Sequence, residues 1–130
     1  MHLAATRIIT DDVDALVAFY EGVTGIAAER LHPLFAELRT PAGTLAIASS
    51  ATVPLLGENA AEARANRSVM LDFRVDDVDA TYDALQGVVD EFVNAPTDMP
   101  WGNRSLLVRD PDGNLVNLFT PVAAPARNLS

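Results

Sequence analysis

The sequence contains no cysteine and no lysine. Without cysteine, disulfides, thiolate catalysis and Cys-ligated metals are excluded. Without lysine, no side chain can form a Schiff base with a carbonyl substrate. All nine basic residues are arginine and 18 residues are acidic, so the net charge is −9, which disfavours binding to a nucleic-acid backbone. The charge mildly favours a neutral or cationic ligand, and acidity that serves solubility alone is the alternative.

The sequence also lacks an apolar run near the roughly 18 residues that a membrane-spanning helix needs. Its first residues do not show the basic-then-apolar pattern of a signal peptide. A chain of 130 residues with 49% hydrophobic and 21% charged residues is typical of one globular domain. From these features we expect a protein that does not enter a membrane and that resides in the cytoplasm.

The pentapeptide DDVDA occurs twice, at residues 11–15 and 76–80. An aspartate of each copy is placed to cap a helix by accepting a free backbone N–H of its first turn. Gly25 and Gly87 are placed to end the two helices. Apolar residues follow each copy at helical spacing, and those that share a helix face are Val13, Leu16, Val17 and Tyr20, then Val78, Tyr82 and Leu85.

A second echo shows that the repeat extends beyond the helix starts. LRTPAGTLAI (38–47) matches VRDPDGNLVN (108–117) at an offset of 70, close to the 65 between the DDVDA copies. Both stretches are typical of a hairpin with a Pro–Gly turn. The sequence therefore predicts an α+β fold with two tandem β-α-β-β-β modules. The expected parts are module 1 at about 2–50, a linker at 51–66, module 2 at about 67–121 and a loose tail at 122–130.

The same patterns predict the individual elements. In module 1 we expect a helix near 12–23 and strands near 3–10, 27–32, 34–40 and 43–49. In the linker we expect a helical turn within NAAEARA. In module 2 we expect a helix near 77–86 and strands near 67–75, 88–94, 103–109 and 114–120.

Paired β-α-β-β-β modules, a helix that contains FY, and DPDGNLV before the last strand resemble the vicinal oxygen chelate superfamily. This group includes glyoxalase I, extradiol dioxygenases, fosfomycin-modifying enzymes, and the bleomycin and mitomycin resistance proteins. The resemblance covers nearly the whole chain and implies that the modules form curved sheets around a U-shaped cleft. It implies much less about activity, because this fold carries many functions.

In the enzymes of this superfamily, His, Gln or Glu side chains from the first and last strands of each module hold a divalent metal. Counting from the matching motifs places these positions at Ala5, Ile47, Met70 and Asn117, with Ala46 and Ala48 as the alternatives to Ile47. None of the four carries a usual ligand, and the carbonyl oxygen of Asn117 alone does not hold a metal. We therefore predict a cleft with no metal and a protein with no cofactor.

Few other residues are candidates for catalysis. His2 lies near the chain start and His32 precedes Pro33 at a strand turn, so we expect both to be exposed rather than metal-binding. Glu37 alternates with Phe35 along one predicted strand, so the two share a face. A carboxylate beside an aromatic ring can act as a base, but an ordinary exposed carboxylate fits the same pattern. Glu37 is therefore a weak catalytic candidate.

The only tryptophan, Trp101, lies in the loop PTDMPWGNRS between Pro100 and Gly102. Such a loop is a poor place for a core residue, and an exposed indole can stack on a planar ligand or a cation. MPWGNR before DPDGN is similar to the metal-free drug-binding members, where the tryptophan stacks against the drug. The resemblance implies that role for Trp101, and packing at a module or subunit interface is the alternative.

Other residues expected to bind a ligand in the cleft are Phe35, Phe92 and Asn117, whereas Met70 and Phe119 are more typical of a core. Arg104 is placed either to hydrogen-bond an anionic ligand or to pair with a carboxylate of this acidic chain. The sequence leaves these two roles open.

The favoured hypothesis is a metal-free protein of the glyoxalase and bleomycin-resistance type that binds an aromatic or amphipathic small molecule, an antibiotic being one candidate. One alternative is a lyase, isomerase or dioxygenase-like enzyme that uses a carboxylate base such as Glu37 on a small oxygenated substrate. Another is an interaction module with no small-molecule ligand. Drug-binding members are usually dimers that share clefts, so the resemblance implies a homodimer, and the cleft forms either within one chain or between two.

Overall fold

The computed structural model describes residues 1–122, and the contacts within the chain define two compact units, Met1–Asn66 and Arg67–Ser130. We call these unit 1 and unit 2. Residues 123–130, which form most of the predicted tail, lie outside the described residues. No helix of residues 1–122 has the length and apolar character to cross a membrane.

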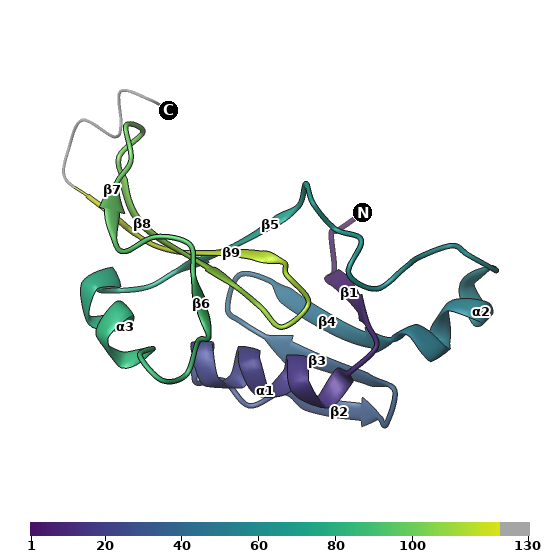
Figure 1. The fold of residues 1–130 in the computed structure, drawn as a ribbon. Helices are drawn as coiled ribbons and strands as arrows, with labels where there is room; N and C mark the ends of the chain where they lie inside the picture. Colours follow the sequence, from purple (N-terminus) through teal and green to yellow (C-terminus); the bar gives the residue numbers. More distant parts are fainter. Residues whose placement is uncertain (123–130) are drawn as a thin grey trace. The chain divides into compact units, whose positions relative to one another are not determined.

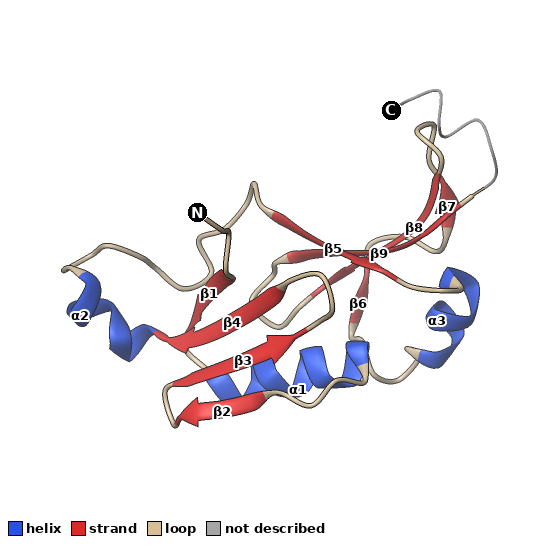
Figure 2. Ribbon diagram, turned by 180° about the vertical axis from the view of Figure 1, so that it is seen from behind, coloured by secondary structure: helices blue, strands red, loops and turns tan. Residues whose placement is uncertain are grey.

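Unit 1 has one four-stranded mixed sheet with strand order β1-β4-β3-β2. β1 runs parallel to β4, and the other neighbouring pairs are antiparallel. Figures 1 and 2 show α1 covering one face of this sheet. The elements in chain order are β1 (Thr6–Thr10), α1 (Val13–Thr24), β2 (Glu29–His32), β3 (Phe35–Arg39), β4 (Thr44–Ser49), the 3-10 helix η1 (Ser50–Thr52) and α2 (Val53–Leu56).

The helix α1 begins and ends at the residues that its sequence predicts. The Oδ1 atom of Asp12 accepts the backbone N–H of Ala15 at 3.0 Å, which satisfies a donor that has no partner within the helix. Gly25 ends the helix with a left-handed φ of 71°. The apolar face is buried against β3 and β4, and its members are Val13, Leu16, Val17 and Tyr20.

Unit 2 repeats this plan with a sheet of order β5-β9-β8-β6, in which β7 also pairs with β8. β5 and β9 are parallel, and the pairs of β8 with β9, β6 and β7 are antiparallel. The elements are β5 (Met70–Arg74), α3 (Val78–Ala84), β6 (Glu91–Phe92), β7 (Thr97–Asp98), β8 (Asn103–Arg109) and β9 (Leu115–Pro121). The two tandem modules of an α+β fold are therefore confirmed.

The second DDVDA copy also caps a helix. The Oδ1 atom of Asp77 accepts the backbone N–H groups of Asp79 and Ala80 at 3.1 and 3.2 Å. The helix is shorter than predicted, because it ends at Ala84 and Gly87 lies in the turn beyond it with φ of 83°. Its sheet contributes the larger part of the core, namely Leu106, Val108, Val116 and Leu118.

Two predicted elements are wrong. The linker helix occupies residues 50–56, whereas the predicted turn in NAAEARA contains Asn59 and Arg64 at positive φ of 59° and 63°, which a right-handed helix cannot include. The predicted strand at 88–94 is reduced to β6, and pairing with β8 resumes only at β7. Between them the Asn94 side chain accepts the N–H of Leu107 at 2.8 Å, and Pro96 has no N–H to donate.

Candidate functional site

Trp101 lies at the tip of the hairpin that joins β7 to β8. The backbone N–H of Met99 donates to the carbonyl of Asn103 at 2.7 Å, and that of Gly102 donates to the carbonyl of Met99 at 3.1 Å, so the turn is closed. Gly102 adopts φ of 98°, which favours glycine. Trp101 is 58% exposed, and its indole has no hydrogen bond or ring contact with residues 1–122.

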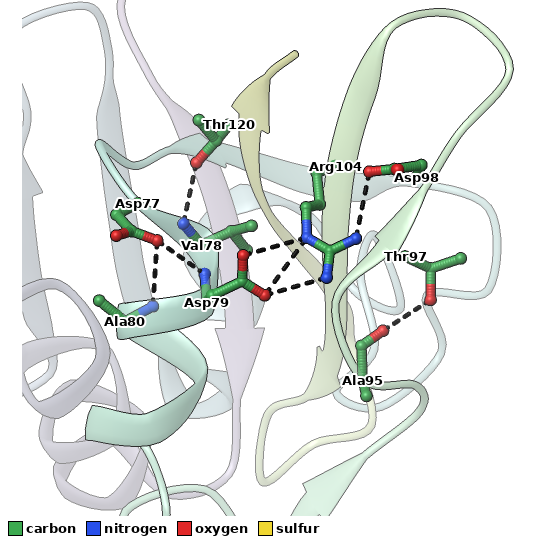
Figure 3. Close-up of polar contacts among 9 residues, drawn as sticks. All are labelled: Asp77, Val78, Asp79, Ala80, Ala95, Thr97, Asp98, Arg104 and Thr120. Carbon is green, nitrogen blue, oxygen red and sulfur yellow. Dashed lines mark hydrogen bonds and ion pairs between the residues drawn. The ribbon is translucent and has the colours of Figure 1, made fainter.

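An arginine fixes this hairpin to the helix of unit 2. Arg104, at the start of β8, pairs through its Nε and Nη2 atoms with the Asp79 carboxylate at 3.0–3.2 Å. Its Nη1 atom pairs with Asp98 of β7 at 3.1 Å. Figure 3 shows the guanidinium between the first turn of α3 and β7. Arg104 thus connects α3 to both strands of the hairpin that carries Trp101.

Of the two roles that the sequence left open for Arg104, the structure shows the pairing with carboxylates, and ligand binding by Arg104 stays a prediction. The hydrogen bonds with Asp79, and then with Asp98, raise the pKa of Arg104 above the ordinary arginine value. The guanidinium is therefore charged and paired with two carboxylates at any physiological pH. We assign it a positioning role, in which it holds the hairpin.

Phe92 is also separated from the predicted cleft residues. Its ring contacts the ring of Tyr82 on α3 edge-to-face, with centroids 5.3 Å apart. Phe92 pairs with Val108, which is fully buried beneath the helix. Adjacent side chains of a strand point to opposite faces, so Phe92 lies on the helix side of the sheet and Asn117 does not. The prediction that Phe92 lines the cleft is therefore not supported.

The face of each sheet opposite its helix is called the far face here. On the far face of unit 2, Asp72 of β5 lies directly beside Asn117 of β9. The Nδ2 atom of Asn117 donates to the Oδ1 atom of Asp72 at 3.0 Å. The Oδ1 atom of Asn117 is buried and has no hydrogen-bond partner within residues 1–122. Met70, predicted as a core residue, lies on this face and is 44% exposed.

The far face of unit 1 is dominated by charges that satisfy one another. Arg39 pairs with Glu37 and with Glu29, each at 2.7 Å. Phe35 shares this face with Glu37 as predicted, and the Cζ atom of Arg7 lies 5.1 Å from the centroid of its ring, which is a cation–π contact. The pairing with Arg39 gives Glu37 a structural partner and does not favour its use as a base.

The strand register identifies the residue of unit 1 that corresponds to Asn117. Arg7 and Asp72 each lie five residues before a helix-capping aspartate, and they pair with Ala46 and Asn117. The counterpart of Asn117 is therefore Ala46, not the predicted Ile47, which is fully buried in the sheet. The count along the sequence gives the wrong residue because the two hairpin turns differ in length. Four residues lie between the paired residues Arg39 and Thr44, whereas five lie between the paired residues Arg109 and Leu115.

The comparisons with known proteins agree with this architecture. The family model described as "Glyoxalase/Bleomycin resistance protein/Dioxygenase superfamily" matches residues 2–118. The chain belongs to this superfamily. The uncharacterized protein YraH of Bacillus subtilis (strain 168) is 30% identical over 125 residues, which cover 92% of this chain and 98% of that protein.

Solved structures of the glyoxalase superfamily have the same fold at low sequence identity. A glyoxalase/bleomycin resistance protein/dioxygenase family enzyme from Burkholderia phytofirmans PsJN gives a TM-score of 0.83 at 20% identity, over 94% of this chain and all of that one. A glyoxalase/bleomycin resistance protein/dioxygenase from Nocardioides gives 0.78 at 24% identity, over 95% and 85% of the two chains. These likenesses establish the fold and leave the activity open.

The metal positions of the glyoxalase superfamily do not fit a metal in this chain. Corrected for the register, they are Ala5, Ala46, Met70 and Asn117, of which only Asn117 offers an oxygen. Asp72 adds one carboxylate beside it, but its Oδ1 atom already accepts the amide of Asn117. Across residues 1–122, no three His, Asp or Glu side chains come close enough to hold a metal ion.

The two histidines lie away from these positions. His2 is exposed near the chain start. His32 is exposed at the β2–β3 turn, where its Nδ1 atom accepts the backbone N–H of Leu34 at 3.0 Å. As the sequence predicts, His32 is an exposed turn residue.

Sequence reasoning missed the acidic residues that matter here. Asp72 interrupts the apolar strand run MLDFR, and this was the one local signal for it. Asp79 and Asp98 are indistinguishable from other exposed acidic residues until the fold brings them to Arg104.

Proposed function

We propose that this glyoxalase-superfamily protein binds a planar aromatic or amphipathic small molecule without a metal, and that the ligand stacks on Trp101. The exposed indole at the tip of a closed hairpin turn is the observation that carries this proposal. A ligand that covers this exposed ring removes apolar surface from water, which favours binding. Its flat face accepts a planar or cationic group, and the net charge of −9 favours a cation.

The hairpin that carries Trp101 is already ordered, so its chain loses little conformational freedom when a ligand binds. Two backbone hydrogen bonds close the turn from Met99 to Asn103, and Pro100 restricts it further. Arg104 holds both hairpin strands to α3. Because the site is ordered before the ligand arrives, less conformational entropy is lost on binding.

Binding without chemical change suits a protein that sequesters a compound, and an antibiotic is one candidate. The alternative enzyme needs a free base, and its candidate Glu37 is paired with Arg39 at 2.7 Å. We therefore prefer binding over turnover. Incubation with a bound compound, followed by mass spectrometry of that compound, separates the two, since only an enzyme changes its mass.

The proposal is tested with Trp101→Ala, and Leu34→Ala is the matched control. Leu34 is an exposed apolar residue in the corresponding β2–β3 turn of unit 1. Loss of the indole removes stacking of about 0.5–1.5 kcal/mol and the burial of the ring, together about 2–3 kcal/mol. Calorimetric titration with proflavine, a planar cation, should show a dissociation constant that rises roughly 30- to 150-fold.

The control and a conservative variant complete this test. Leu34→Ala should leave proflavine affinity unchanged, and Trp101→Phe should lose only part of it. Equal weakening by Trp101→Ala and Leu34→Ala would mean that the acidic protein binds the dye non-specifically. Unfolding of Trp101→Ala would show that the indole is a packing residue, and the proposal would then fail.

We also propose that the protein forms a homodimer. Unit 1 exposes several large apolar side chains that a partner subunit can cover, namely Leu31, Leu55 and Leu56. Sedimentation at micromolar concentration should give about twice the chain mass of 13.9 kDa. A species of single-chain mass throughout the concentration range would contradict this proposal.

A further inference from the structure

The Asp72–Asn117 pair on the far face of unit 2 has hydrogen-bonding capacity that the described chain leaves unused. Asn117 gives one amide hydrogen to the Oδ1 atom of Asp72 at 3.0 Å. Its own Oδ1 atom is buried without a donor. The free capacity of both side chains is therefore acceptor capacity, since an ionised carboxylate donates nothing.

An orphaned acceptor at a buried position opposes folding, because it loses its hydrogen bond to water and gains none in return. The same strand position in unit 1 holds Ala46, which shows that this sheet geometry accepts a small apolar residue there. Asn117 is thus not demanded by the fold. A polar residue kept at a cost to stability is a candidate for ligand recognition.

The neighbours of the pair provide an apolar wall. Met70 lies two residues before Asp72 on β5, Leu107 pairs with Asn117 on β8, and Phe119 lies two residues after Asn117 on β9. All three therefore share the far face of the sheet with the pair. An aromatic or aliphatic frame can pack on these side chains while one polar group reaches the acceptors.

The charges around the two acceptors decide which kind of ligand group they bind. Arg74 lies two residues after Asp72 on the same strand face. Its positive charge offsets that of Asp72, so the site does not favour a cation as such. What remains specific is the pair of acceptors, which needs an N–H or O–H donor.

We infer that Asp72 and Asn117 form a subsite for a hydroxyl or amine donor carried on an apolar frame. This inference rests on the proposed function, because it names the polar group of the amphipathic ligand. The subsite is separate from the turn that carries Trp101. Leu107, which pairs with Asn117, lies six residues after Trp101, and six residues of extended chain span roughly 20 Å. Since the Asn117 oxygen is buried, the donor reaches it through a side-chain rotation.

Three small probes separate donor from charge in the whole protein. Phenethylammonium carries a charge and donors, 2-phenylethanol carries a donor without charge, and trimethyl(phenethyl)ammonium carries the charge without a donor. We expect the first two to shift the side-chain amide NMR signals of Asn117 with saturation at millimolar concentration. The third should bind at least about tenfold more weakly, since it leaves both acceptors unsatisfied.

Substitutions test the same residues. Asp72→Asn and Asn117→Leu should each weaken phenethylammonium at least about tenfold, and Asp83→Asn, an exposed carboxylate on α3, should change nothing. Asn117→Leu should unfold at no lower a temperature than the wild type, because it removes the orphaned acceptor. A residue with a structural role would instead lose stability on this change.

The outcomes distinguish this inference from the proposed function. The indole N–H signal of Trp101 in the same spectra reports stacking. If proflavine shifts the Trp101 signal while the probes leave Asn117 unshifted, the subsite is overturned and the stacking proposal stands. Equal binding of all three probes, with the Trp101 shift present, has the same consequence. Shifts at Asn117 with proflavine silent at Trp101 support the subsite and overturn the stacking proposal.

Discussion

The two units have the same plan, yet they differ at the sheet edge and on the far face. In unit 1 the edge is a single strand, β2, with a register shift between Arg30 and His32, and the far-face charges pair with one another. In unit 2 the edge is broken into β6 and β7, the hairpin that follows carries an exposed indole, and the far face holds an orphaned acceptor. Duplication therefore preserves the helix cap and the strand order, and the exposed indole and the unpaired acceptor are both found in unit 2.

A similar contact in each unit shows how this difference is built. The third aspartate of each DDVDA copy pairs with an arginine of its own sheet: Asp14 with Arg30 in unit 1, and Asp79 with Arg104 in unit 2. Only the second arginine has another carboxylate partner, Asp98 of the hairpin, among the contacts of residues 1–122. In unit 1 this contact ties α1 to β2, and in unit 2 the arginine also holds the hairpin that carries Trp101.

The largest expected difference lies in the helix cores. Leu16 is fully buried, whereas its counterpart 65 residues later is the half-buried Thr81, which hydrogen-bonds the carbonyl of Asp77. Leu16→Ala should cost about 2–5 kcal/mol of unfolding free energy, and Thr81→Ala less than about 1 kcal/mol. Urea unfolding measures both, and similar losses would show that the two helices contribute equally to stability.

The helix caps should show a smaller difference. Asp12 accepts one backbone N–H and Asp77 accepts two, and α3 is the shorter helix. Each change to alanine should cost about 1 kcal/mol, with Asp77→Ala at least as costly as Asp12→Ala. Thermal unfolding of the two variants checks the order, and a larger loss for Asp12→Ala would show that the number of capping bonds does not decide it.

Loss of the Arg104 contacts that hold the β7–β8 hairpin should affect binding more than folding. Arg104→Gln removes the pairs with Asp79 and Asp98, which are exposed and therefore weak. We expect proflavine affinity to fall roughly two- to fivefold, with part of it recovered in Arg104→Lys. Arg30→Gln in unit 1 is the matched control and should leave proflavine affinity unchanged. If it lowered that affinity as much as Arg104→Gln does, Arg104 would have no specific role in positioning the hairpin.

The smallest expected effect is that of pH on the Arg104 contacts with Asp79 and Asp98. The pKa of Arg104 is raised in the folded protein, so its contribution is complete below the unfolded value and is lost only when pH rises through the folded one. Both values lie far above neutrality. Proflavine affinity at about pH 7 and about pH 9 should therefore agree, once the charge of the dye itself is matched. A loss of affinity at the higher pH would mean that another group controls the hairpin.

Local signals explain which parts of the fold the sequence predicts. The caps Asp12 and Asp77 and the hairpin turns depend on residues close together in the chain, so both were predicted. The break in the edge strand was missed, because it depends on Asn94 reaching Leu107. The one-residue insertion before Leu115 misplaced a far-face position, because adjacent residues of a strand point to opposite faces.

The candidate site was predicted only where a residue acts without a protein partner. Trp101 has no hydrogen bond or ring contact among residues 1–122, so its loop composition was enough to single it out. Asp72 and Asn117 are 45 residues apart and meet only through the parallel pairing of β5 with β9. For Arg104 the sequence left ligand binding and carboxylate pairing open, because Asp79, 25 residues away, resembles any other exposed acidic residue until the fold brings the two together.

The central claim, a metal-free ligand site in unit 2, is tested most directly by Trp101 fluorescence after exhaustive dialysis against a chelator. Trp101 is the only tryptophan, so its emission reports on that unit alone. We predict that titration with proflavine quenches the emission with saturation, at the same dissociation constant before and after chelation, and that added Zn, Ni, Fe or Mn changes nothing. Binding that disappears with the chelator and returns with one of these metals would contradict the account.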